Sequence, residues 1–482
     1  MTKFRYAHTN FKHGEISPKV QGHFDTNEYK DGVDTLENFL PLQAGGVTKR
    51  PGTKLEREIV NLGYDSALGG PAVIPFIVNN SDAYVVVIKN DGTNNGGFEI
   101  FKSDEANTQQ TVTNISLLRS VANTVDPRGY VYAQSNDFLF VTHTSGQIRP
   151  FFIARDDSGN FHVDDYLSQT VYYLATRDPR PVSNPALSTP YRARNVSDVT
   201  LTPSATSGSI TITASDPTFS TGHVDSVFKI NHGGTEGMAR VSAYSSPTSV
   251  TASVIVNFGA TTASTDWAES AWSDHRGYPT SVAIYENRLC WGGQQGVKPL
   301  SDTIWFSLSG NFFHMMSERL QQDKAGSDVS QLNFFGDAAD LPFASDPFNA
   351  VIGASESNVI TWMHSARSLL VGTQGGEYVV DSGQNALFGN PLASGSAGFS
   401  QKKQTSFGSR GAKVAGLDNS VFYISRDGRS VRNFKYSREN GSFISAEISA
   451  HGEHMHRQGR QNFQYGYNAF KGIETYLSLI HI

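Results

Sequence analysis

A hairpin pattern that occurs twice between residues 358 and 436 constrains the fold of this chain more than any other feature. Each copy has two short runs of β-branched and aromatic residues, separated by a turn rich in Gly, Asp and Ser. Such runs are typical of two antiparallel strands joined by a tight turn. A repeat of the pattern after about fifty residues predicts stacked or radial β-sheet units. The two copies pair 368–371 with 377–380, and 421–424 with 430–436.

Three further copies precede these two. Asn90-Asp91-Gly92 lies between two of the runs, and this tripeptide is a strong turn signal. The content of 45 Gly, 30 Phe and 19 Tyr, with only 17% charged residues, also favours strands and turns over helices. We therefore predict a mostly β protein built as a β-propeller-like repeat of hairpins. The three copies comprise the runs 72–76, 83–88 and 97–101, then 138–141 and 148–152, then 281–284, 289–291 and 303–307.

The composition changes between residues 194 and 274. Ser and Thr alternate there with Val and Ile, which is the pattern of a half-buried strand. We predict an inserted small β domain, with Trp267 and Trp272 on a short helix that closes it. The predicted domains are an N-terminal segment with the first hairpins (1–193), the insert (194–274), further hairpins (275–450) and a truncated end (451–482).

Charge and cysteine content exclude several classes of protein. The formal net charge is −6 and Lys and Arg form no cluster, which argues against a protein that grips nucleic-acid phosphates. It does not argue against a surface past which DNA slides. The single cysteine, Cys290, excludes an intramolecular disulfide and is expected to be a small buried apolar residue. No apolar stretch is long enough for a membrane-spanning helix.

No motif predicts catalysis, a cofactor or a metal. Gly372–Gly376 leads into a strand, so we interpret it as a hairpin turn instead of a phosphate-binding loop. Ser425–Arg429 resembles the Asp-box of sialidase-like propellers, but its spacing fails. His451, His454 and His456 lack the spacing of a helical metal pair. Paired acids such as Asp31 with Asp34, or Asp337 with Asp340, are expected by chance among 45 acidic residues.

Residues 14–53 carry a long gapped pattern of glycines, prolines and aromatic residues. It includes Gly14-Glu15-Ile16-Ser17-Pro18, then Gly22, Asp25, Tyr29, Gly32 and Asn38-Phe39, and ends with Gly45-Gly46 and Arg50-Pro51-Gly52-Thr53. This run resembles the opening of the nozzle, or tail tubular protein B, family of short-tailed bacteriophages. The resemblance covers most of residues 14–440, with a weaker tail. His23 departs from the pattern, since members of the family usually carry Arg there.

The resemblance implies a structural protein of the virion tail, assembled in the cytoplasm of the bacterial host. It implies a homo-oligomer, a hexameric ring below the tail adaptor protein, which conducts DNA during ejection without binding it specifically. Contacts with tail fibres would belong to the same assembly. The alternative is a β-propeller tail protein that binds or cleaves glycans, which predicts aromatic residues beside a carboxylate pair in one cleft.

The last residues form a separate expectation. Leu477–Ile482 looks like the translation of a transposon end used in sequencing libraries, so we expect these six residues to be foreign to the gene. We expect the gene to continue beyond them, because the relatives are longer and the hairpins are too few to close a propeller.

Overall fold

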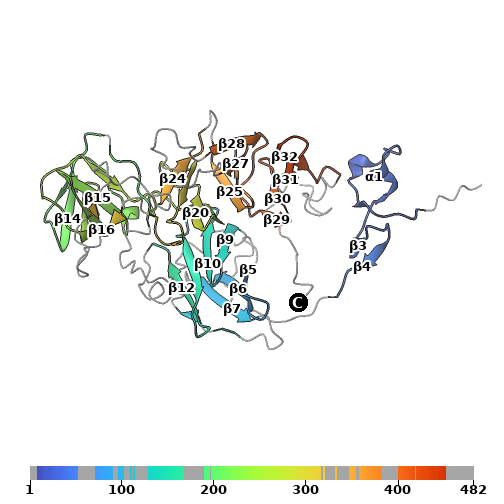
Figure 1. The fold of residues 1–482 in the computed structure, drawn as a ribbon, viewed down its shortest axis with the longest axis horizontal. Helices are drawn as coiled ribbons and strands as arrows, with labels where there is room; N and C mark the ends of the chain where they lie inside the picture. The colour runs from blue at the N-terminus through green and yellow to red at the C-terminus, as the bar shows by residue number, and fades with distance from the viewer. Residues whose placement is uncertain are drawn as a thin grey trace, which may run out of the picture. The chain divides into compact units, whose positions relative to one another are not determined.

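The computed structural model is almost entirely β structure, and among the residues it describes it contains a single α-helix, the four-residue α1 (Asn27–Lys30). Contacts divide the chain into two compact units, Met1–Val60 with Phe407–Ile482, and Asn61–Ser406. Figure 1 shows the chain as a ribbon. The structure describes residues 8–52, 71–90, 96–102, 109–110, 112–113, 129–167, 189–195, 197–315, 319–320, 332–333, 347–353, 358–381, 400–417 and 419–451.

The second unit contains four similar sheets in succession. In each, the main strands that follow one another in the sequence are neighbours and run antiparallel. In the second sheet, the short β8 also pairs in parallel with β12. The sheets comprise β5 (Ala72–Ile77), β6 (Ala83–Asn90) and β7 (Gly96–Lys102); β8 (Val112–Thr113), β9 (Tyr130–Ser135), β10 (Phe138–His143), β11 (Phe151–Arg155) and β12 (Phe161–Asp165); β19 (Ser281–Tyr285), β20 (Arg288–Gly292), β21 (Thr303–Phe306) and β24 (Phe348–Val351); β25 (Ile360–Ser365), β26 (Leu369–Thr373), β27 (Glu377–Asp381) and β28 (Ser400–Thr405).

Consecutive sheets share apolar cores, which explains why these strands are apolar at successive positions. On β10, Leu139 and Val141 belong to the core shared with the first sheet, whereas Phe140 belongs to the core shared with the third. The alternation follows from side chains that point to opposite faces of a strand. A third core lies between the third and fourth sheets and contains Cys290 and Val371. The predicted hairpin repeat is therefore confirmed as a propeller-like series of sheets.

First strands of the later sheets lie beside one another. β9 packs against β19, and β19 packs against β25. Sheets stacked face to face, with their first strands adjacent, have the radial arrangement of propeller blades. A separate short pair, β22 (Arg319–Leu320) with β23 (Leu332–Asn333), lies in the connection between β21 and β24.

Within the second unit, the predicted insert forms one six-stranded sheet with its own core, which contains Ile212, Phe228 and Val250. The predicted helix is wrong, because Trp267 lies on β18 and pairs with Ile230. The order is β13-β14-β17-β16-β15-β18, and the bounds are β13 (Leu201–Pro203), β14 (Ser209–Ala214), β15 (Val227–His232), β16 (Thr235–Ser246), β17 (Ser249–Val256) and β18 (Trp267–Glu269), with the 3₁₀ helix η6 (Thr221–His223) between β14 and β15.

The first unit contains the two ends of the chain. The Ser17 N–H donates to the His451 carbonyl at 2.8 Å, so residues far apart in the sequence meet here. The Thr26 side chain caps α1 by accepting from the Tyr29 N–H. The strands are the parallel pair β1 (Gly14–Glu15) and β2 (Gly32–Val33), the hairpin β3 (Phe39–Pro41) and β4 (Val47–Lys49), and the sheet β29 (Ala415–Leu417), β30 (Ser420–Ile424), β31 (Val431–Ser437) and β32 (Ser442–Glu447), with the 3₁₀ helix η1 (Pro18–Val20).

Candidate functional site

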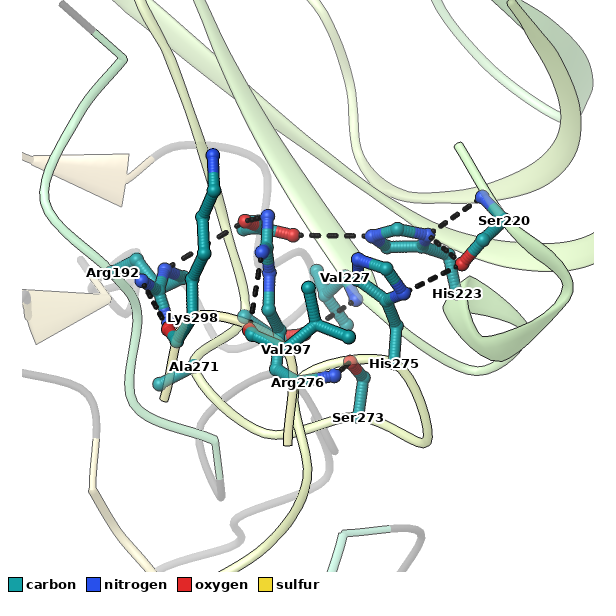
Figure 2. Close-up of polar contacts among 12 residues, drawn as sticks. Arg192, Ser220, His223, Val227, Ala271, Ser273, His275, Arg276, Val297 and Lys298 are labelled. Atoms are coloured by element: carbon teal, nitrogen blue, oxygen red, sulfur yellow. Dashed lines mark hydrogen bonds and ion pairs between the residues drawn. The ribbon is translucent and has the colours of Figure 1, made fainter. Parts of the chain in front are cut away.

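Buried polar groups concentrate where the inserted sheet joins the propeller-like sheets. The insert and the neighbouring sheets have separate apolar cores. The chain enters the insert through 191–195 and leaves it through 267–278, and the two passages are bonded together. The Arg192 N–H donates to the Glu269 carbonyl at 3.0 Å, and the Ala271 N–H donates to the Pro190 carbonyl at 2.7 Å. Figure 2 shows the side chains of this junction.

Glu269, at the end of β18, is the buried anion of the junction. Its carboxylate accepts a hydrogen bond from Arg276, and it lies 3.7 Å from Arg192 Nε and 3.3 Å from His223 Nε2. Burial alone would raise the pKa of Glu269, but hydrogen bonds from His223 and Arg276 outweigh it and hold the pKa below its ordinary value. The carboxylate is therefore charged and neutralises part of the surrounding positive charge.

Two histidines stack beside this carboxylate, with ring centroids 4.3 Å apart. The Ser220 N–H donates to His223 Nδ1 at 2.9 Å, so Nδ1 is an acceptor, and His223 Nε2 faces the Glu269 carboxylate at 3.3 Å. Ser220 Oγ lies 3.0 Å from His223 Nδ1 and 2.9 Å from His275 Nδ1. Burial, together with the neighbouring His223 and Arg276, lowers the pKa of His275 to about 4. His275 is therefore neutral at neutral pH.

Ser220, His223 and Glu269 are the residue types of a hydrolytic triad, but their arrangement is that of a structural cap. Ser220 precedes η6, and His223 reaches back to the Ser220 backbone as in a capping box. The imidazole is fully buried, and its acceptor nitrogen already binds a backbone N–H. A base in this position has no free path to an external substrate.

Arg149 forms a second ionic group, which ties three segments together. Its guanidinium lies 3.0 Å from Asp225 in the insert, 3.2 Å from Asp274 in the exit passage and 3.5 Å from Asp165 at the end of β12. Burial disfavours the charged guanidinium, but Tyr278, Asp274 and Asp165 more than compensate and raise the pKa of Arg149. This residue holds the insert against the second sheet.

A small hollow beside Arg149 contains both aromatic and charged side chains. Trp272 Nε1 and Arg240 Nε are buried there and have no hydrogen-bond partner among the described residues. The free space is about that of one water molecule. The lining residues are Arg149, Asp165, Leu167, Val224, Asp225, Arg240, Trp272, Ser273 and Tyr278.

A third ionic group fixes the passage into the insert. The buried pair Lys229 and Glu236 lies across β15 and β16, with 3.6 Å between Nζ and Oε1. Arg194 binds the same carboxylate at 2.7 Å and Asp266 at 2.6 Å. The Lys229 ammonium also lies 4.2 Å from the centroid of the Tyr191 ring. A buried pair of this kind adds little net stability, but loss of one partner would leave the other charge buried without compensation.

The N-terminal run that carries the family resemblance presents apolar side chains to solvent. On the hairpin β3–β4, Phe39 is 47% exposed and Leu40 is 49% exposed. The two side chains lie on opposite faces of the hairpin, so each face carries one exposed apolar group. The hairpin is the second candidate site.

Two turns predicted from the sequence are turns in the structure. Gly372–Gly376 forms the hairpin turn between β26 and β27, and Ser425–Arg429 forms the turn between β30 and β31, as predicted. Cys290 is fully buried, which raises the pKa of its thiol. His451 is described and exposed, but His454, His456 and the pair Asp337 and Asp340 lie outside the described residues, as does Leu477–Ile482.

Within the described ranges, His, Cys, Asp and Glu side chains form no group of three or more suited to a metal ion. No helix in the same ranges has the length and apolar character needed to cross a membrane. Asp31 lies 3.9 Å from His13, and Asp34 accepts from Gln21, so each of these acids has its own partner.

Three solved structures are similar to this chain at low sequence identity. No protein-family model matches the chain, and no curated protein matches it. Among solved structures, a protein from Lactobacillus plantarum is 11% identical, with coverage of 84% of this chain and 88% of its own and a TM-score of 0.31. The phage phi92 endosialidase is 12% identical, with coverage of 79% and 55% and a TM-score of 0.22. A lectin from Aleuria aurantia is 10% identical, with coverage of 79% and 96% and a TM-score of 0.22.

Proposed function

We propose that this chain is a structural subunit of the nozzle of a short phage tail. Several copies form a ring below the tail adaptor, and the ring conducts DNA into the host during ejection. The observation that carries the proposal is the gapped run from Gly14 to Thr53, which resembles the opening of the nozzle family over many positions. A long gapped pattern is far more specific than a short motif.

The structure of this run supports an assembly role. A two-stranded hairpin has no core of its own and is marginally stable in water. The apolar side chains of β3, Phe39 and Leu40, nonetheless face solvent. A segment of this composition gains stability when an assembly covers it.

The proposed role is structural and not enzymatic. The Ser220, His223 and Glu269 group has the contacts of a cap, and its histidine is closed to solvent. The net charge of −6 fits a channel that lets DNA pass without retaining it, since like charges repel. The protein would then belong to the virion tail after assembly in the host cytoplasm, with tail fibres as further neighbours.

Electron microscopy of the chain mixed with the adaptor protein of the same genome tests this proposal. We expect particles in which a six-fold ring with a central channel lies on one side of the adaptor. Separate particles of the two proteins, over a range of concentrations and salt, would contradict the proposal.

A second candidate function is glycan recognition, and one observation favours it. The hollow beside Arg149 brings the carboxylates of Asp165 and Asp225 close to Trp272 and Tyr278. Aromatic rings with acidic side chains are the groups that bind sugars in many proteins. The space takes about one water molecule, so a sugar ring enters only if side chains move.

The two functions are separated by a binding experiment. Screening against an array of bacterial surface glycans, followed by calorimetry, is expected to show no binding if the chain is a nozzle. Binding that is lost in the Asp225→Asn variant would favour the glycan function and would identify the hollow as its site.

A further inference from the structure

The turn between β31 and β32 contains an asparagine that is followed directly by a glycine. Ser437 pairs with Ser442 at the end of the ladder, so residues 438–441 form the connection between the two strands. All four residues of this connection are exposed. The Asn440 side chain and the backbone that follows it are therefore open to water.

Gly441 leaves the approach to its own nitrogen open. Its φ is +58°, in the left-handed region that favours glycine, and an added Cβ would meet no other atom within 4 Å. Among the described residues, no acceptor binds the Gly441 N–H. No strand pairing holds this nitrogen, since β32 begins one residue later.

This arrangement places a nucleophile beside a weak electrophile. The nitrogen of the residue after an asparagine can attack the side-chain amide carbon, and the reaction is intramolecular, so it needs no encounter. A side chain on the following residue crowds the approach, and pairing within a strand holds the nitrogen in place. A glycine nitrogen outside the ladder is therefore the most favourable case.

We propose that Asn440 is a site of spontaneous deamidation in the folded chain. The Gly441 nitrogen forms a bond to Asn440 Cγ, the bond between Cγ and Nδ2 breaks, and ammonia leaves with the proton that Gly441 loses. Water then opens the cyclic succinimide at either carbonyl, which gives a mixture of aspartate and isoaspartate. Water is the only co-reactant, and each event replaces a neutral amide with a carboxylate.

Other asparagines of the described chain lack this combination. Within the described ranges, no other asparagine precedes a glycine. Asn160 precedes Phe161, which is fully buried and pairs with Arg155 in the ladder. Asn287 is exposed, but the next residue is the buried Arg288, the first residue of β20. These two asparagines are therefore suitable internal controls.

The modification changes the turn and leaves its hairpin in place. The Phe443 ring stacks on Phe434, with centroids 5.1 Å apart, and lies 5.4 Å from the Tyr436 ring. These contacts join the two strands whatever the turn carries. The charges of Arg438 and Glu439 cancel, so the turn acquires one net negative charge. This inference does not depend on the function proposed above.

Peptide mapping of the aged full chain by mass spectrometry tests the proposal. The native protein is kept in mildly alkaline buffer at physiological temperature, and samples are digested at intervals. The peptide with Asn440 is expected to show the mass of an acid in place of the amide and to separate into two forms. Enzymatic methylation identifies the isoaspartate form. The Asn160 and Asn287 peptides are expected to convert at least about tenfold more slowly.

One further peptide is followed separately. Asn95 precedes Gly96 in the sequence, and Asn95 lies outside the described residues. Its conversion is measured on its own peptide and does not enter the comparison.

A pair of glycine variants tests the part played by the Gly441 nitrogen. Gly441→Ala adds a side chain to the attacking residue, so conversion of Asn440 is expected to slow at least about tenfold. Gly428→Ala is the matched control, because Gly428 also has a positive φ, +73°, in the turn between β30 and β31. It introduces a similar backbone strain but leaves Asn440 and Gly441 unchanged, so the wild-type rate is expected. Circular dichroism checks that each variant keeps its fold.

Three results would overturn the proposal. The first is an unmodified Asn440 in the native chain over the time in which the same peptide is converted in urea. The second is conversion of Asn160 or Asn287 in the native chain as fast as that of Asn440. The third is equal conversion of Asn440 in the wild type and in Gly441→Ala, which would mean that the Gly441 nitrogen is not the nucleophile.

Discussion

Replacing Glu269 with Gln is the perturbation that most directly tests the junction of the inserted sheet. The substitution preserves size but removes the one carboxylate that Arg192, Arg276 and His223 share. Burial and the positive charge of the neighbouring Arg276 lower the pKa of Arg192, because the two guanidinium groups repel each other. Removing one partner of a buried ion pair costs about 3 kcal/mol, because the remaining charges stay buried without compensation.

Hydrogen exchange is the appropriate assay, since a chain of this size with separate cores is not expected to unfold in one step. The informative amides are Arg192, which donates to the Glu269 carbonyl, and Ser270, which donates to the Val227 carbonyl. A loss of about 3 kcal/mol in local opening free energy corresponds to exchange about a hundredfold faster at these amides. Amides of the core strand β10 are expected to be unaffected.

Asp266→Asn supplies the matched control at the same junction. Asp266 binds Arg194, but both side chains are partly exposed, Asp266 by 44%, so solvent screens the ion pair and it contributes less than about 1 kcal/mol. Exchange in Glu269→Gln that stays within about threefold of the control would refute the reasoning, because the buried carboxylate would then stabilise the junction no more than the exposed one does.

Three further predictions follow from buried groups. The pKa of His275 falls from 6.5 in the unfolded chain to about 4 in the fold. As the pH falls below 6.5, the unfolded chain therefore takes up a proton at His275 before the folded chain does. The stability of the junction is greatest above pH 6.5 and declines as the pH falls toward 4. His275→Gln is expected to flatten this decline in hydrogen exchange at Ser270, and an unchanged pH profile would contradict the assignment. Arg149→Met leaves Asp165 buried without its cation, so we expect the local opening free energy at the Asp225 amide, measured by hydrogen exchange, to fall by about 3 kcal/mol. Unaltered exchange at this amide would contradict the role of Arg149 in holding the insert. Cys290 is expected to resist thiol reagents in the native chain and to react at once in denaturant, whereas rapid native labelling would show that its core opens.

The hairpins could be predicted because their signals are local. Strands such as β26 and β30 are short apolar runs bounded by turn residues, and the pairing partner follows within a few residues. The inserted sheet was predicted for the same reason, since the alternation of Ser and Thr with Val and Ile needs no distant information.

The helix at Trp267 was a wrong prediction because tertiary pairing decides the conformation there. Trp267 lies opposite Ile230, which is 37 positions earlier, and no local pattern reports this partner. A spacing of five between Trp267 and Trp272 is weak evidence for a helix, because residues on one helix face recur three or four positions apart.

The ionic junction could not be predicted either. Arg192, His223 and Glu269 come from three separate segments, and only the fold brings them together. Single charged residues carry no periodic signal, so their partners are invisible in the sequence.

The mass of the assembled protein in solution tests the central proposal most directly. Mass photometry of the chain is performed alone and with the adaptor protein of the same genome, at several concentrations. The nozzle account predicts a species of about six subunits whose mass increases when the adaptor is added. A monomer whose mass is indifferent to the adaptor would contradict the account.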